Sequence, residues 1–220
     1  VKEEQGESGL LLRFINPIAG KIAEKYPEVK IRSFAYSMGE TVPRLTRPAS
    51  NVILCYCDSY QSSDCYRPLD AEHREKITAW QKAGANLMVW DYWNMGNRFF
   101  YPPRPEVMID AIQADLKFFR DMKVKGVFLE AEKDFVTPQN FADLQYFLAA
   151  QLMIDPDKPV EPLINFYLKN YYGASAPMMR RYLDNLREGV ASQKKPQITF
   201  QMSRWEFLSP EFMIDNYRLL

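Results

Sequence analysis

The stretch that decides the fold is Asn86-Leu-Met-Val-Trp-Asp-Tyr-Trp93, an apolar run with one carboxylate near its end. Its apolar residues do not alternate with polar ones, which is typical of a strand buried on both faces of a parallel sheet. The run Asn51-Val-Ile-Leu-Cys-Tyr-Cys57 has the same character, and residues 30–37 and 125–132 are two further strand candidates. Helical periodicity around these runs gives the order strand, helix, strand, helix, which predicts an α/β protein with a parallel sheet.

Four parallel strands within about 130 residues make up half of a (β/α)8 TIM-type barrel, because a whole barrel takes about 250 residues. A small open doubly wound sheet is the alternative. No glycine-rich Gly-x-Gly-x-x-Gly turn and no phosphate loop follows a strand, so nucleotide binding loses its main support. We therefore expect residues 1–155 to form the second half of a barrel and residues 156–220 to form a C-terminal helical region. On this interpretation the missing strands precede Val1 and the chain is a fragment.

Composition narrows the classes of function. The 220 residues carry 28 basic and 28 acidic side chains, and this zero net charge argues against a nucleic-acid partner. No apolar run reaches the roughly 20 residues that span a bilayer, so we expect no membrane span. Three cysteines offer no zinc site, and the single histidine, His73, lies on what we interpret as a solvated helix turn. We therefore expect neither a metal nor another cofactor.

The carboxyl ends of the expected strands carry carboxylates and aromatic residues, and active sites of barrels lie at those ends. Hydrolysis of a glycosidic bond needs one carboxyl group to protonate the leaving oxygen and another to activate water or attack directly. Aromatic faces hold sugar rings. The candidate catalytic residues are Asp91, Glu130 and Glu132, and the candidate sugar-binding residues at the strand ends are Tyr36, Asp58, Tyr92 and Trp93.

The loop after residue 93 adds further candidate sugar contacts. Phe100 and Tyr101 offer ring faces, and Asn97 and Arg98 offer groups that bond hydroxyls or a sugar carboxylate. Each candidate has a structural alternative: the carboxylates as satisfied core or turn residues, and the aromatic residues, which make up 14% of the chain, as core packing.

Short segments that carry a family resemblance follow one another from about residue 8 to about residue 186. They are Leu11-Leu-Arg-Phe-Ile-Asn-Pro-Ile-Ala19, Tyr26-Pro-Glu-Val-Lys30, Ala35-Tyr36, Asn51-Val52, Trp90-Asp91-Tyr92, Gly126-Val-Phe-Leu-Glu130 and Phe166-Tyr-Leu-Lys-Asn-Tyr-Tyr-Gly173. In this order they resemble a bacterial family of uncharacterised, glycosidase-like barrel domains, the domain of unknown function 4838. That family is common in glycan-degrading gut bacteria and is distantly similar to alpha-glucuronidases.

The resemblance implies a (β/α)8 barrel, location in the periplasm, at the cell surface or outside the cell, and an oligosaccharide or polysaccharide as ligand. In the alpha-glucuronidase relatives, an inverting pair of carboxylates near the ends of late barrel strands activates water. Asp91 and Glu130 occupy plausible places for that pair, and the general acid would then lie before Val1. The chain has Glu130-Ala131-Glu132 where the family commonly has Glu-Gly, so which glutamate points inward stays open.

We therefore expect a glycoside hydrolase that acts on complex glycans, uronic-acid-containing or host-derived, by carboxylate general acid–base chemistry. The alternative is a non-catalytic carbohydrate-binding barrel of a glycan-utilisation system, whose carboxylates only bond hydroxyls. A third and weaker interpretation is an interaction module that forms a homodimer through the C-terminal helices.

Overall fold

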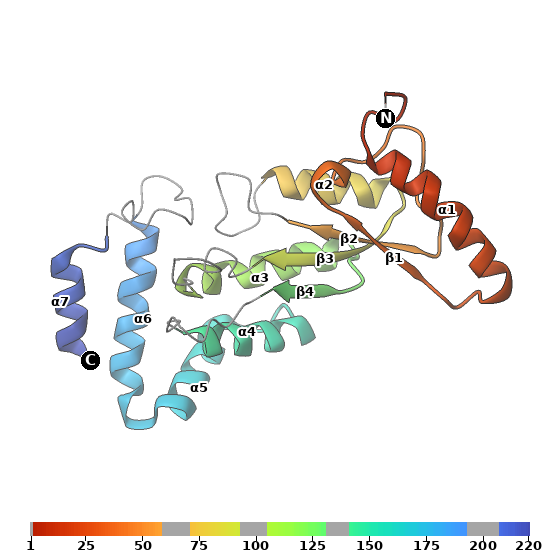
Figure 1. Ribbon diagram of the computed structural model, residues 1–220. Helices are drawn as coiled ribbons and strands as arrows, with labels where there is room; N and C mark the ends of the chain where they lie inside the picture. The colour runs from red at the N-terminus through yellow and green to blue at the C-terminus, as the bar shows by residue number, and fades with distance from the viewer. Residues whose placement is uncertain (1, 59–70, 93–104, 131–140, 193–206) are drawn as a thin grey trace. The chain divides into compact units, whose positions relative to one another are not determined.

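A computed structural model describes residues 2–58, 71–92, 105–130, 141–192 and 207–220 (Figure 1). The chain divides into two compact units. Unit 1 comprises residues 1–61, 70–93 and 118–131, and unit 2 comprises residues 62–69, 94–117 and 132–220. The sequence predicts a boundary at 155/156, whereas unit 2 also takes in the helix before that point and most of the helix that begins at Pro105.

Unit 1 is built on a four-stranded parallel sheet in the order β1-β2-β3-β4, which confirms the predicted parallel α/β architecture. The strands are β1 (Ile31–Ala35), β2 (Val52–Cys57), β3 (Asn86–Tyr92) and β4 (Val127–Glu130). Each lies inside the range expected from its apolar run. Because the strands are parallel, their carboxyl ends meet at one edge of the sheet.

Residues along each strand point alternately to the two faces of the sheet. One face carries Leu54, Tyr56 and Val89, which are at most 1% exposed, and we call it the covered face. The other face carries Phe34 and Phe128, which are 42% and 47% exposed, and we call it the open face. The sheet therefore has one face packed against helices and one with exposed aromatic side chains.

Helix α2 (Ala71–Lys82) packs on the covered face. Its inward residues His73, Ile77 and Trp80 lie at helical spacing and are all buried. The His73 ring forms a 2.6 Å hydrogen bond with the hydroxyl of Tyr56 on the covered face. Gly84 follows the helix with φ of +80°, a left-handed conformation that glycine adopts readily and that turns the chain into β3.

The end of helix α3 (Pro105–Asp121) lies beside α2 in unit 1. The guanidinium of Arg74 sits 4.4 Å from the ring centroid of Phe118, and the hydroxyl of Thr78 lies 3.6 Å from the sulfur of Met122. The helical segments that follow β2 and β3 are therefore neighbours in this unit.

Helix α1 (Ser8–Lys25) packs through Leu12, Ile15 and Ala19, which lie at helical spacing. The hydroxyl of Ser8, at the start of the helix, donates to the carbonyl of Thr41. The side chain of Asn51 donates to the carbonyl of Ala19 and ties the start of β2 to the helix.

Glu4 anchors the chain in front of α1. Its carboxylate accepts hydrogen bonds from the side chains of Arg13 and Thr46 and from the backbone amides of Leu45 and Thr46. The hydrogen bond from the Thr46 hydroxyl is the main reason that the pKa of Glu4 falls to about 2. The ionised form of Glu4 therefore links the N-terminal segment, α1 and the loop before β2.

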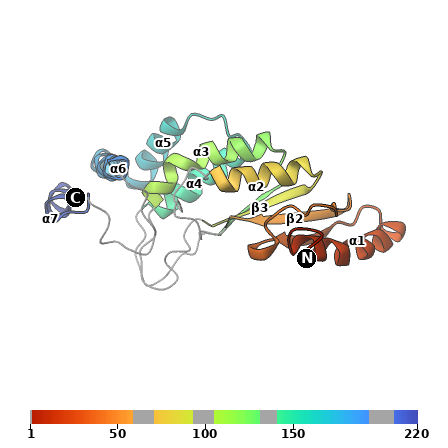
Figure 2. The same cartoon turned by 90° about the horizontal axis from the view of Figure 1, so that it is seen from above.

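Unit 2 is helical. Besides residues 105–117 of α3, it contains α4 (Ala142–Ile154), α5 (Val160–Tyr172), α6 (Ala176–Ala191) and α7 (Pro210–Leu219), and the short 3-10 turn η3 (Gly173–Ser175) joins α5 to α6. Consecutive helices from α4 to α7 contact one another, and Figures 1 and 2 show α6 and α7 side by side. Helices α5, α6 and α7 lie within residues 156–220, where the sequence predicts a helical region.

Ion pairs join three helices of unit 2. The guanidinium of Arg187 on α6 lies 2.6 Å from a carboxylate oxygen of Asp110 on α3 and 2.9 Å from one of Glu161 on α5. Arg180 lies 2.7 Å from the other oxygen of Glu161. These contacts raise the pKa of Arg187, with Asp110 the main cause, and fix the side chains between α3, α5 and α6.

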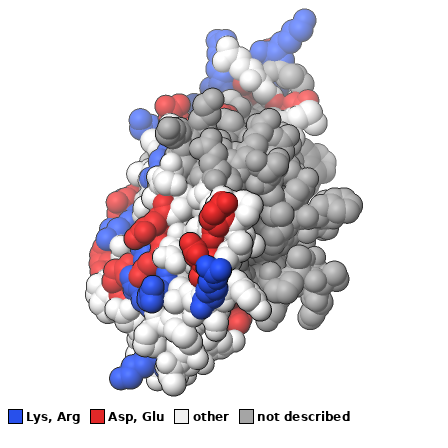
Figure 3. Space-filling view, turned by 90° about the vertical axis from the view of Figure 1, so that its left-hand side faces the viewer, with Lys and Arg blue, Asp and Glu red and all other residues white. Residues whose placement is uncertain are grey.

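Charged side chains of both signs lie on the surface of the described residues. On the face seen in Figure 3, acidic and basic side chains are interspersed over the described residues and form no large basic patch. Within the described ranges, every helix is too short or too polar to span a bilayer.

Candidate functional site

The structure describes some of the predicted site residues and not others. Tyr36, Asp58, Asp91 and Glu130 are described, and Tyr92 is described through its backbone. The other candidates, Trp93, Asn97, Arg98, Phe100, Tyr101 and Glu132, lie outside the described residues. The geometry of the candidate site therefore comes from the strands themselves.

Three aromatic rings contact one another across the open face. The Trp90 ring lies 5.8 Å from that of Phe34 and 4.3 Å from that of Phe128, measured between centroids, and both pairs are tilted. The strand register explains this, because Trp90 pairs directly with Phe128. Aromatic pairs at these separations stabilise one another, yet both phenylalanines keep more than two fifths of their surface exposed.

Glu130 lies on the same face, at the carboxyl end of β4. Its Oε2 atom accepts a 2.5 Å hydrogen bond from the indole N–H of Trp90. Glu130 pairs in register with Tyr92, which is the last residue of β3. The indole therefore holds the carboxylate against the aromatic surface at the edge where the strand ends meet.

Tyr36 extends this surface beyond β1. It follows Ala35 in an extended conformation, with φ of −137° and ψ of 142°, so strand alternation places it on the same side as Phe34. Its side chain is 46% exposed. The open face thus offers Phe34, Tyr36, Trp90, Phe128 and Glu130, and we call these five residues the open-face site.

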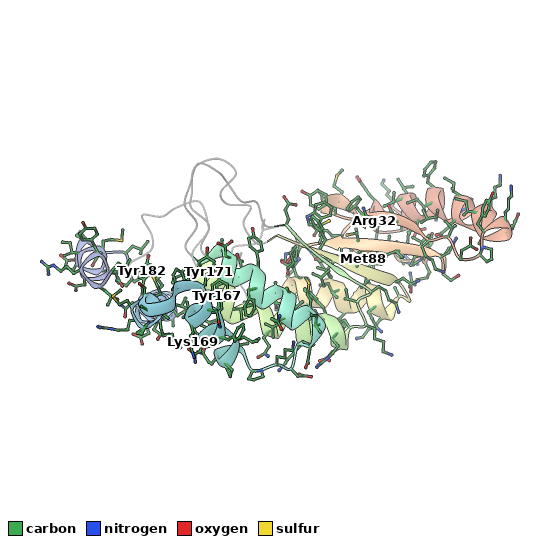
Figure 4. All side chains as sticks on the ribbon, turned by 90° about the horizontal axis from the view of Figure 1, so that it is seen from below. Arg32, Met88, Tyr167, Lys169, Tyr171 and Tyr182 are labelled. Carbon is green, nitrogen blue, oxygen red and sulfur yellow. The ribbon has the colours of Figure 1, made fainter. Side chains whose placement is uncertain are left out.

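Further along the open face lie a cationic side chain and sulfur-bearing residues. Figure 4 shows Arg32 and Met88 on the sheet, and the register puts both on the open face. The guanidinium of Arg32 lies 5.9 Å from the Phe34 ring centroid, within reach of a cation–π contact. Cys55 and Cys57 are buried free thiols, and the pKa of Cys57 is raised by its hydrogen bonding with Cys55 and by burial, which keeps it protonated. Cys57 is therefore a packing residue, whereas its hydrogen bond with Cys55 lowers the pKa of the Cys55 thiol.

Asp58 and Asp91 lie on the covered face. Asp91 pairs with Leu129 in the sheet register, one residue before the pair formed by Tyr92 and Glu130. The backbone N–H of Asp58 donates to the carbonyl of Trp90 at 3.2 Å and so continues the ladder one residue beyond β2. The two carboxylates are 4% and 2% exposed. The structure brings Asp58 and Asp91 to neighbouring positions and places Asp91 and Glu130 on opposite faces of the sheet.

His73 is buried, contrary to the solvated turn that the sequence predicts for it. It is 6% exposed and shares a hydrogen bond with the buried Tyr56 hydroxyl. The signal was present, because His73 lies four residues before Ile77 and seven before Trp80 and so shares their inward face. The sequence pattern gives no sign of Trp90 as a site residue, because Trp90 lies within an apolar run that predicts burial.

The open-face site combines ring surfaces with one hydrogen-bonded carboxylate. Such a surface binds a ligand that has both apolar faces and hydroxyl donors. The described ranges contain no group of three or more histidine, cysteine, aspartate or glutamate side chains arranged to hold a metal ion. The described part of the site offers a carboxylate beside aromatic rings, with the Arg32 guanidinium further along the face.

Comparison with known proteins gives one match. A family model described as a domain of unknown function, DUF4838, matches residues 1–184, which is most of the chain. No curated protein and no solved structure matches it.

Proposed function

Because the chain belongs to the DUF4838 family of domains of unknown function, its activity has to be inferred from its own residues, and we propose that it is a glycoside hydrolase whose sugar lies on the open-face site. One observation carries this proposal: the indole of Trp90 holds the Glu130 carboxylate at the carboxyl edge of an exposed aromatic surface. Aromatic rings stack on the faces of a sugar, and the carboxylate lies where the glycosidic bond would be.

The sheet topology supports the proposal that these strands are the second half of a (β/α)8 barrel. The four parallel strands follow one another across the sheet in sequence order. Connections between parallel neighbours are right-handed as a rule, so segments that join strands in this order lie on one face of the sheet. The contact of α2 with Tyr56 and the closeness of the α3 end to α2 agree with that arrangement. In a barrel the open face is the interior, and Glu130 then lies at the mouth, where catalytic residues are found.

Hydrolysis uses two carboxyl groups, and Glu130 supplies one of them. In this proposal Glu130 acts as the base that takes a proton from the attacking water. The second group protonates the leaving oxygen. Asp91 is set aside for that role because the register points it to the covered face. Glu132, which alternation would return to the side of Glu130 if β4 continued, is the candidate within this chain.

The class of substrate rests on the family resemblance and on the aromatic surface. We propose complex glycans, uronic-acid-containing or host-derived, and a place of action in the periplasm, at the cell surface or outside the cell. A homodimer through the C-terminal helices is also a proposal, supported by the exposed Met213 and Tyr217 on α7. A mass measurement in solution tests the dimer, and a monomer at high concentration contradicts it.

The experiment that tests hydrolysis compares the protein with Glu130→Gln on a panel of uronic-acid-rich and host-type oligosaccharides, following new reducing ends. We expect the parent to cleave and the variant to lose at least about a hundredfold in rate, since acid–base catalysis alone contributes about 10²–10⁴. Glu28→Gln is the matched control, because Glu28 is an exposed carboxylate outside the site. Equal rates for the parent and Glu130→Gln would contradict the assignment of Glu130.

A non-catalytic carbohydrate-binding barrel is the second candidate function. The five residues of the open-face site include a single carboxylate, Glu130. Hydrolysis uses two carboxyl groups, so this composition favours binding without cleavage. It predicts no cleavage of any oligosaccharide in the panel, together with a rise in melting temperature on addition of the bound sugar. Trp90→Ala would remove that rise, because it removes the central ring of the surface.

A further inference from the structure

A row of contacting aromatic rings follows the seam between α4 and α5 in unit 2. Phe147 on α4 contacts Phe166 and Tyr167 on α5, with centroids 6.1 and 5.3 Å apart. Tyr167 stacks on Tyr171 at 5.0 Å with 16° between the ring planes, and Tyr171 meets Tyr172 edge-on at 4.9 Å. We call these five residues the aromatic row.

The aromatic row extends beyond what the core of the helix pair requires. Helix α5 buries Ile164 and Leu168, which lie one turn apart and form its core stripe. Phe166 and Tyr171 remain 60% and 58% exposed. Figure 4 shows Tyr167 and Tyr171 close together on α5, with Lys169 on another side of the helix. Part of the row is thus available on the surface of unit 2.

A carboxylate lies beside the row. The hydroxyl of Tyr171 donates a 3.2 Å hydrogen bond to Oδ2 of Asp143, an exposed residue near the start of α4. That hydrogen bond raises the pKa of Tyr171, and burial raises the pKa of Tyr167. Both phenols therefore stay neutral at physiological pH and keep a hydrogen-bond donor.

We propose that the aromatic row and Asp143 form a second saccharide-binding site, which takes a neutral sugar ring of a glycan chain. This ring stacks on Tyr171 and its hydroxyl groups donate to Asp143, while a neighbouring ring of the same chain stacks on Phe166. The class of ligand rests on the proposed function, whereas the residues are separate from the open-face site.

The chemistry of the site selects this occupant over two others. An apolar protein surface would remove water from the exposed Asp143 carboxylate and donate no hydrogen bond in its place, and desolvating a charge in this way is costly. An anionic ligand would be repelled by the same carboxylate. A neutral sugar has apolar ring faces for the aromatic side chains and hydroxyl donors for the carboxylate.

Affinity electrophoresis tests the proposal in native gels that contain soluble xylan, galactomannan or mixed-linkage glucan. We expect at least one of these neutral polysaccharides to retard the 220-residue protein. Tyr171→Ala and Phe166→Ala should each weaken the retardation about threefold to tenfold, the range expected for one aromatic contact. Both residues are more than half exposed, so each variant should fold, and thermal unfolding checks this.

Phe14→Ala is the matched control, because Phe14 is a 71% exposed aromatic residue on α1, outside the row. The inference is overturned if no polysaccharide retards the parent, if both row variants bind as the parent does, or if Phe14→Ala weakens binding equally. Glu130→Gln separates the two proposals. If Glu130→Gln loses hydrolysis but is retarded as the parent is, both sites are supported. If Glu130→Gln hydrolyses as the parent does, while the row variants still lose retardation, only the role of Glu130 is contradicted.

Discussion

The two faces of the sheet are formed by alternate residues of the same four strands, yet they are buried very differently. On the covered face, Tyr56 and Val89 are fully buried and α2 packs against them. On the open face, Phe34 and Phe128 contact Trp90 and keep 42% and 47% of their surface exposed. Both faces are apolar, so apolar character alone does not distinguish a packing surface from a binding surface.

The difference between the faces lies in their polar groups as well. The covered face ends in Asp58 and Asp91, both buried, whereas the open face ends in Glu130, held by the Trp90 indole beside exposed rings. Carboxylates at the ends of neighbouring strands therefore take different roles according to the face they occupy. A substitution that changes stability but not ligand binding, or ligand binding but not stability, tests this difference between the two faces.

The largest effect is expected from Trp80→Ala beneath the covered face. Trp80 is 1% exposed and its indole N–H donates to the carbonyl of Glu40 at 2.7 Å. Loss of the ring should lower the free energy of unfolding by about 3–5 kcal/mol, measured by urea denaturation. Trp80→Phe, which keeps a ring and loses the donor, should cost less. If Trp80→Ala were as stable as the parent, the packing of α2 on the covered face would contribute little to the free energy of unfolding.

A smaller loss is expected from Tyr56→Phe, which removes the hydroxyl bonded to His73. The His73 ring is buried and would lose a hydrogen bond that water cannot easily replace, so we expect a cost of about 1–3 kcal/mol in urea denaturation. Tyr36→Phe is the control, since Tyr36 is 46% exposed and should change stability little. Equal effects of the two substitutions would contradict the burial contrast between the faces.

Much of the fold follows from the sequence because apolar periodicity and helix ends are local signals. Residues 8–25 repeat apolar positions at helical spacing, and β2 and β3 are apolar without alternation, so their type and approximate bounds are predictable. For β2 the absence of alternation correctly indicates burial on both faces, since Cys55 and Cys57 on the open face are 1% and 2% exposed. The exposure of Phe34 and Phe128 depends on which segments pack there, and periodicity contains no such information.

The candidate site is less predictable from the sequence, because the register between strands decides to which face of the sheet a strand residue points. The sequence places Asp91 and Glu130 at strand ends, but only the pairing of Asp91 with Leu129 and of Tyr92 with Glu130 shows that they point to opposite faces. A shift of one residue in either strand would reverse that result. Trp90 as the partner of Glu130 follows from the same register.

The pH dependence of stability offers a further test, on the N-terminal segment that Glu4 anchors in unit 1. The pKa of Glu4 is lowered from 4.5 to about 2 in the folded protein, chiefly by the Thr46 hydroxyl. Its stabilising effect is therefore complete above about pH 4.5 and is lost as the pH falls through about 2. Urea midpoints measured between pH 5 and pH 2 should fall more steeply for the parent than for Glu4→Gln.

Glu3→Gln is the control for that measurement, because the Glu3 side chain is 77% exposed and should leave the slope unchanged. Parallel curves for the parent and Glu4→Gln would show that the carboxylate is not a folding anchor. The open face would be unaffected in either case, because Glu4 contacts α1 and the loop before β2 rather than the aromatic rings.

The smallest effect on stability is expected from Phe128→Ala on the open face, and it decides the comparison. Phe128 is 47% exposed, so we expect a loss of about 1 kcal/mol or less in urea denaturation, well below that of Trp80→Ala. The same substitution removes a ring 4.3 Å from Trp90 and should weaken sugar binding, measured as a smaller sugar-dependent rise in melting temperature. A stability loss as large as that of Trp80→Ala would mean that the open face is a packing surface like the covered one. A small loss combined with weaker binding would mean that the face serves a ligand, because only a ligand would then depend on the ring.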